Sequence, residues 1–169
     1  MKYSEVREHA ANGDLLLLEG KGPVGRFIRV VTGQQISHVA MLLWLDEGLW
    51  VAEMRNAGYS FAPASQRIPE MQEQGIVYWG KAPRQVRNRP IHIHEKALSF
   101  RGSRYSWWSL VTVWCAQVLK RQMPRNLVCS TFVEKVWEAA GWNFHQTPDP
   151  GDFVPLCDGM HAITADEKG

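Results

Sequence analysis

The chain has 169 residues, of which 45% are hydrophobic and 21% are charged, a composition typical of one globular domain with its own core. Its formal net charge of +2 is too small to indicate a nucleic-acid-binding protein, so we expect no nucleic-acid partner. We therefore expect residues 1–169 to form a single domain.

The first elements in the chain are predicted to be a helix, a buried strand and a second helix. Residues 3–11 suit a short helix that ends at Asn12-Gly13, and residues 15–19 form an apolar run typical of a buried strand. After a turn at residues 20–23, the apolar residues of the segment 24–31 recur at helical spacing. The first strand is thus expected to lie between two helices in the sequence.

The next two strands are predicted at residues 37–45 and 49–55, joined by a tight turn. A two-residue loop, such as Glu47-Gly48, would place His38 and Glu53 on the same face of the hairpin. A loop with an odd number of residues would place them on opposite faces. Two-residue loops are the more frequent type, so the shared face is favoured.

The middle of the chain is predicted to be less regular. Residues 57–75 contain two prolines and are expected to form an irregular surface segment beside a cleft. Residues 75–79 suit another strand of the same sheet, and residues 91–101 suit a helix. An apolar helix is predicted at residues 107–120, and the tail after residue 147 is rich in turn residues.

The segment 126–137 places Cys129 between a polar loop and an amphipathic helix. Apolar residues recur at helical spacing from Val128 to Val136, and Ala140-Gly141 would end this helix. Cys129 then lies in the first helical turn, where free backbone N–H groups and the positive end of the helix dipole favour a thiolate. The alternative is a buried, inert thiol, which is common for free cysteines.

The cysteines and the N-terminal residues indicate the compartment. Cys115, Cys129 and Cys157 form no C-x-x-C pair, and their odd number argues against a disulfide framework and a structural zinc site. The first nine residues are polar, so no signal peptide is expected, and no apolar run is long enough to span a membrane. We therefore expect a cytoplasmic protein without an integral membrane span; leaderless export and association with a virion are the alternatives.

Cys129 could act as a nucleophile if a base were close to it. A thiol nucleophile needs an imidazole within hydrogen-bond reach and a third polar group that orients the ring. His38 begins one predicted strand, Glu53 lies on the neighbouring strand, and Cys129 begins a helix. Packing that helix across the sheet would bring the three side chains together at one end of the sheet.

Short motifs follow one another through most of the chain. They are Gly13-Asp14-Leu15-Leu16, Thr32, Ser37-His38-Val39-Ala40-Met41, Val51-Ala52-Glu53, the segment 102–105, Val128-Cys129-Ser130-Thr131-Phe132-Val133 and Pro150-Gly151-Asp152. Their order resembles that of the circularly permuted NlpC-like, papain-like cysteine hydrolases, the YiiX/YaeF-like permuted amidases. The lecithin:retinol acyltransferase-like enzymes share this permutation, in which the histidine strand precedes the cysteine helix, as His38 precedes Cys129.

The resemblance implies an α+β papain-like fold with a small antiparallel sheet packed against helices. It implies that Cys129 is the nucleophile, His38 the general base and acid, and Glu53 the orienting residue, although other polar residues take this third place in related enzymes. Backbone N–H groups at Cys129 would form part of the oxyanion hole. No cofactor and no metal are implied.

The reaction that the resemblance implies is hydrolysis of an amide bond through an acyl-enzyme intermediate. The substrate would be peptide-like or another acyl amide, with a cell-wall peptide as the first expectation. One alternative is an acyltransferase or a lipid-amide or ester hydrolase, like the acyltransferase-like relatives. Another is a catalytically silent binding module on the same fold. The sequence leaves the oligomeric state open.

Several other residues have structural interpretations. Cys115 is expected to be an inert core thiol, and Cys157 lies in a late loop without a base motif beside it. The histidines of the segment 92–95 lack the further ligands that a metal site needs. Asp14 either approaches the active site or caps a turn, and the arginines of the segment 84–89 are expected on a solvated loop.

Overall fold

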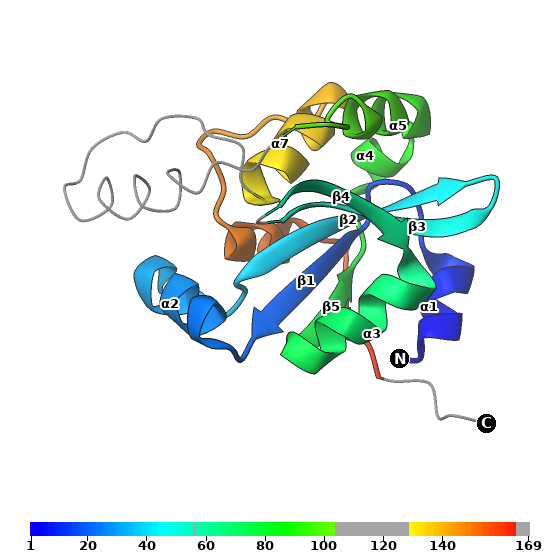
Figure 1. Ribbon diagram of the computed structural model, residues 1–169. Coiled ribbons are helices and arrows are strands. Elements are labelled where there is room, and N and C mark those ends of the chain that lie inside the picture. The colour runs from blue at the N-terminus through cyan, green and yellow to red at the C-terminus, as the bar shows by residue number, and fades with distance from the viewer. Residues whose placement is uncertain (56, 104–128, 165–169) are drawn as a thin grey trace.

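The computed structural model describes residues 1–55, 57–103 and 129–164 (Figure 1). Its centre is a six-stranded sheet in the order β4-β3-β2-β1-β5-β6, in which all neighbouring strands are antiparallel. The strands are β1 (Leu15–Gly20), β2 (His38–Leu45), β3 (Gly48–Arg55), β4 (Gly58–Pro63), β5 (Gly75–Gly80) and β6 (Met160–Ala162). The expected α+β class with an antiparallel sheet and helices is confirmed.

Helices cover both faces of the sheet (Figure 1). The helices are α1 (Tyr3–His9), α2 (Pro23–Thr32), α3 (Ala64–Gln74), α4 (Arg84–Arg87), α5 (Pro90–Leu98), α7 (Cys129–Ala139) and the 3-10 helix η1 (Pro150–Leu156). α1 and α3 pack on one face, and α4, α5 and α7 pack on the other. α2 follows β1 and lies beyond the end of the sheet where β2 begins.

The apolar run of β1 reflects its position in the middle of this layered arrangement. Successive side chains of a strand point to opposite faces. Leu15 and Leu17 pack in the core beneath α5 and α7, and Leu16 and Leu18 pack in the core beside α1 and α3. Because both faces of the sheet are covered at β1, residues 15–18 of the strand are all apolar and do not alternate with polar residues.

The hairpin of β2 and β3 confirms the predicted shared face. Leu45 pairs with Gly48, so the loop has two residues, Asp46 and Glu47. This loop begins one residue earlier than the Glu47-Gly48 loop considered from the sequence. Its number of residues is still even, and His38 and Glu53 therefore share a face of the sheet.

The prediction of an irregular segment at residues 57–75 was wrong, because β4 and α3 occupy it. Pro63 precedes the first turn of α3, where a missing N–H costs little, whereas Pro69 lies inside the helix. The helix persists there because Ala64, Ile68 and Met71 are buried against the sheet. Tertiary packing thus outweighs the local effect of the proline.

The expectation of a solvated loop at residues 84–89 was also wrong in part. Arg84 to Arg87 form α4, and Arg87 donates two hydrogen bonds to Asp14, from Nε at 2.8 Å and from Nη2 at 2.5 Å. The fully buried Asp14 carboxylate also accepts hydrogen bonds from Trp79 Nε1 and the Ala82 N–H. Asp14 therefore has a structural role that joins β1, β5 and α4.

Other boundaries shift by a few residues. The first helix ends at His9 rather than at residue 11, and the helix expected at residues 91–101 is α5. The apolar helix predicted at residues 107–120, with Cys115, lies outside the described residues. Within the described ranges, no helix has the length and apolar character needed to cross a membrane.

Candidate active site

Cys129, His38 and Glu53 come together from three elements. His38 begins β2, and Glu53 lies near the end of β3 on the same face of the sheet, the face that α3 covers. Cys129 begins α7, which packs on the opposite face. The three side chains meet at the end of the sheet where β2 starts, so the cysteine reaches the histidine around that end.

The imidazole of His38 joins the other two side chains. Its Nε2 lies 2.6 Å from Oε2 of Glu53, and the ring also hydrogen-bonds Cys129. Since Nε2 faces the carboxylate, Nδ1 is the nitrogen that faces the sulfur. The His38 side chain is 19% exposed and that of Glu53 is 1% exposed, so water reaches the imidazole but not the carboxylate.

The charges of this group favour an ion pair between the thiol and the imidazole. Burial lowers the pKa of His38, but the Cys129 thiolate and the hydrogen bonds with Cys129 and Glu53 outweigh burial and raise that pKa to about 10. Burial raises the pKa of Cys129, but the His38 charge and hydrogen bond, with the backbone N–H groups of Val39 and Ser130, leave it lowered. Both shifts favour a thiolate beside an imidazolium over the neutral pair of thiol and imidazole.

Arg67 is a site residue that the sequence analysis missed. Burial raises the pKa of Glu53, but the hydrogen bonds and charges of His38 and Arg67 bring it down to about 2. Arg67 Nε donates to Glu53 Oε1, Nη2 donates to Oε2 at 3.3 Å, and Nη1 donates to Glu70 Oε2 at 3.0 Å. Its position within the buried stripe of α3 is the signal that could have revealed it, because an arginine in an apolar stripe needs a buried anion.

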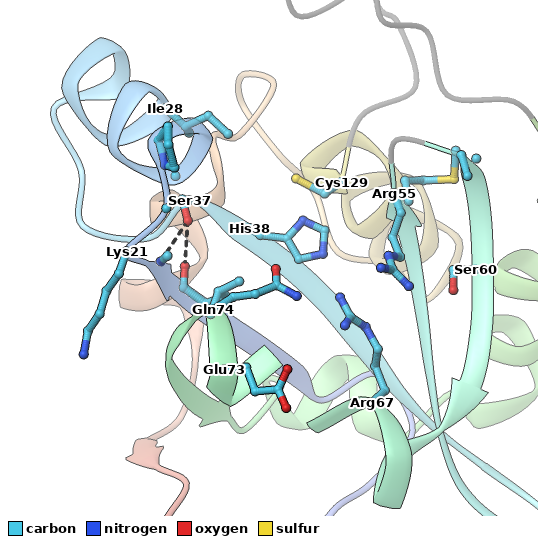
Figure 2. Close-up of a pocket in the computed structure, with 18 of the residues that line it drawn as sticks. Lys21, Ile28, Ser37, His38, Arg55, Ser60, Arg67, Glu73, Gln74 and Cys129 are labelled. Atoms are coloured by element: carbon cyan, nitrogen blue, oxygen red, sulfur yellow. Dashed lines mark hydrogen bonds between the residues drawn. The ribbon is translucent and has the colours of Figure 1, made fainter. Parts of the chain in front are cut away.

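Ser37 fixes the start of β2 and so the position of His38. Its hydroxyl accepts a hydrogen bond from the Gly20 N–H at 3.0 Å and donates one to the Leu18 carbonyl at 3.2 Å. These bonds tie the first residues of β2 to the end of β1 (Figure 2). The backbone that carries His38 is therefore fixed against the neighbouring strand β1.

A cleft of about 1060 Å³ opens over Cys129 and His38. Leu18, Pro23 and Ile28 contribute an apolar wall at the β1–α2 side, whereas Arg55 and Ser60 line the side formed by β3 and β4. Figure 2 shows the sulfur of Cys129 and the imidazole of His38 directed toward this space. The part of the chain from residue 57 to residue 60 borders the cleft, as the sequence predicted.

The remaining candidates from the sequence are not part of this group. Cys157 is a free thiol whose pKa is raised to about 12 by burial and by the negative charges of Asp14 and Asp158. A ring nitrogen of His94 lies 3.0 Å from the side-chain oxygen of Asn12. Neither side chain lines the cleft.

Comparison with known proteins bears on the fold. The chain is similar to a solved structure described as "metalloprotein yiiX from Escherichia coli O157:H7, DUF1105", with a TM-score of 0.54 and 20% sequence identity. The alignment covers 77% of this chain and 66% of that chain, less than two thirds of the latter's length. The chain matches no protein-family model and no curated protein sequence. The likeness shows a YiiX-like fold, while the papain-like permutation stays a prediction.

That neighbour is described as a metalloprotein, so we asked whether side chains of this chain could hold a metal ion. In the described ranges, no three His, Cys, Asp or Glu side chains are grouped so that they could hold a metal ion. Cys129 and His38 supply two donors, but both oxygens of Glu53 already accept hydrogen bonds from Arg67. These residues do not fit a resident metal.

Proposed function

We propose that the protein is a cysteine hydrolase that cleaves an amide bond through an acyl-enzyme intermediate. The observation that carries the proposal is the continuous hydrogen-bonded series of Cys129, His38 and Glu53 beside an open cleft. Such a series gives a thiol nucleophile, a base beside it and a group that orients the base. The resemblance in motif order supports the same assignment.

In the first step, the Cys129 thiolate attacks the carbonyl carbon of the substrate and forms a C–S bond. The negative charge moves to the carbonyl oxygen, where backbone N–H groups in the first turn of α7 would stabilise it, since these groups lack intrahelical acceptors. The C–N bond then breaks, and the Nδ1 proton of His38 passes to the leaving amine. The product of this step is a thioester on Cys129 and a neutral His38.

In the second step, a water molecule attacks the thioester while His38 accepts one of its protons. The C–S bond breaks, the acid is released, and the thiolate and imidazolium are restored. Glu53 fixes Nε2 as a protonated nitrogen and stabilises the positive ring in both steps. Arg67 holds Glu53 ionised and in position, and so acts as a positioning residue.

The proposal includes two candidate classes of substrate. A peptide-like or other acyl amide fits the chemistry, and the motif resemblance favours a cell-wall peptide. The apolar side chains at the β1–α2 side of the cleft favour a second candidate, an acyl or lipid amide or ester whose hydrocarbon part would contact Leu18, Pro23 and Ile28. Transfer of the acyl group to an acceptor other than water would use the same first step.

Trapping the covalent intermediate tests the function. The protein is mixed with a panel of acyl thioesters and aryl amides, quenched in acid, and examined by intact-mass and peptide mass spectrometry. An acyl adduct on Cys129 is expected in the wild type and in Cys157→Ala, the matched cysteine control, and none is expected in Cys129→Ala. Binding of these compounds without an adduct or turnover would instead support a silent binding module.

A further inference from the structure

Arg55 is a cation in the cleft whose guanidinium has no hydrogen-bonded partner in the part of the chain that the structure describes. It is the last residue of β3, two residues after Glu53, and therefore points to the same face of the sheet. Its cross-strand neighbour is Gly58, which has no side chain to cover it. The Arg55 side chain is 45% exposed and lines the cleft together with Cys129 and His38. Figure 2 shows the guanidinium directed into the space between His38 and Ser60.

Glu53 is the carboxylate nearest to Arg55, but other residues already use it. Arg55 Nε lies 4.0 Å from Glu53 Oε1, which is beyond hydrogen-bond distance. Oε1 accepts from Arg67 Nε, and Oε2 accepts from Arg67 Nη2 and faces His38. Among the described residues, the five N–H donors of Arg55 therefore have no hydrogen-bond acceptor.

The other charged side chains that line the cleft are not available cations beside the reacting sulfur. Arg67 is buried and paired with Glu53 and Glu70. Lys21 and Glu73 are exposed and lie away from Arg55 in the view of Figure 2. Ser60, which pairs with Glu53 across β3 and β4, adds an uncharged hydroxyl on the side where Arg55 lies. A small anion next to the reacting sulfur could thus accept hydrogen bonds from the planar guanidinium of Arg55 and from the hydroxyl of Ser60.

We infer that Arg55 is a specificity-determining residue that binds an anionic group of the substrate, such as a carboxylate, close to the bond that Cys129 attacks. This inference rests on the proposed function, because it concerns a substrate that reacts with Cys129. It narrows the substrate class to acidic acyl amides, such as peptides with an acidic residue beside the scissile bond. A neutral amide of the same shape would leave the guanidinium, within the described ranges, with only its 4.0 Å ion pair to Glu53.

Two thiol reagents of similar size and opposite charge test this inference without knowledge of the substrate. Sulfonatoethyl methanethiosulfonate is anionic and trimethylammonioethyl methanethiosulfonate is cationic; each is attacked by a thiolate at sulfur and releases methanesulfinate. The rate at Cys129 is followed by peptide mass spectrometry. We expect the anionic-to-cationic rate ratio to fall by up to about fivefold in Arg55→Gln, since an exposed ion pair is worth up to about a fivefold factor.

Arg84→Gln is the matched control, because it removes the same charge from an exposed residue that does not line the cleft. The Arg84→Gln change should leave the anionic-to-cationic rate ratio unchanged. Arg55→Lys, which keeps the positive charge, should retain most of the preference for the anionic reagent. In the wild type, added salt should move the ratio toward the value that the two reagents show with a small free thiol, a readout that needs no variant. Fast modification by both reagents with an equal ratio in wild type and Arg55→Gln would overturn this inference alone. Slow modification by both, at the rate of a free thiol, would overturn the proposed function as well.

Discussion

Replacing Arg67 by Met tests whether this arginine holds the buried carboxylate of Glu53. Both residues are almost fully buried, and Arg67 donates to both carboxylate oxygens. Removal of one partner from a buried, hydrogen-bonded ion pair costs about 3–5 kcal/mol because it leaves an uncompensated charge. We therefore expect Arg67→Met to lower the free energy of unfolding by about this amount at pH 7.

The pKa of Glu53 gives an independent magnitude and a pH dependence. A carboxylate with a pKa of about 2 in the folded state, against 4.5 for the free group, contributes about 3 kcal/mol to stability at neutral pH. Because the folded pKa is the lower one, this contribution is present above the unfolded pKa and is lost as the pH falls through the folded pKa. His38 carries part of it, and Arg67 carries the rest. The difference between the wild type and Arg67→Met should therefore narrow as the pH falls from about 5 to about 2.

Urea unfolding followed by tryptophan fluorescence at several pH values measures both effects. The matched comparison is the same Arg67→Met change in a Glu53→Gln background, where removal of Arg67 leaves no buried carboxylate unpaired at position 53. There the cost should fall to about 1 kcal/mol, the value of an ordinary hydrogen bond. A cost below about 1 kcal/mol in the wild-type background, or an equal cost in both backgrounds, would refute the role given to Arg67.

Three further outcomes are expected. Glu53→Gln should lower the pKa of His38 below about 10, because the carboxylate contributes a charge and a hydrogen bond to it; NMR titration of the imidazole would show this, and an unchanged pKa would contradict it. Asp14→Ala should lower stability by about 3 kcal/mol in thermal melts, since it leaves the buried partners of the carboxylate unpaired, and should leave the Cys129 alkylation rate unchanged. Cys157 should resist iodoacetamide near pH 8 until the protein unfolds, because its pKa is raised to about 12; rapid labelling of the folded protein would count against this.

Local patterns in the sequence predicted the elements that carry the candidate site. The alternation and turn residues of the β2–β3 hairpin gave the shared face of His38 and Glu53, because an even loop preserves the parity of the pairing. The apolar spacing after Cys129 predicted α7. The chain order of these elements then brought the three side chains to one end of the sheet.

The local patterns did not predict the residues that surround Cys129, His38 and Glu53. The prolines of the segment 57–75 hid α3, whose stability comes from burial against a distant part of the sheet. Arg87 was expected on a solvated loop and Arg67 was not singled out, because the carboxylates they bind lie far away in the sequence. Long-range ion pairs leave no local periodicity of their own. The buried stripe of α3 would have marked Arg67, but the prolines argued against a helix there.

The most direct test of the account is the pH dependence of Cys129 alkylation by iodoacetamide, measured from about pH 4 to about pH 10 in the wild type and in His38→Ala. An imidazolium beside the sulfur stabilises the thiolate, so the wild-type rate should rise with an inflection below the reference thiol pKa of about 8.5. In His38→Ala, the inflection should move upward, because the positive partner is gone. A wild-type rate that rises only near the free-thiol pKa and does not change in His38→Ala would contradict an activated nucleophile at Cys129.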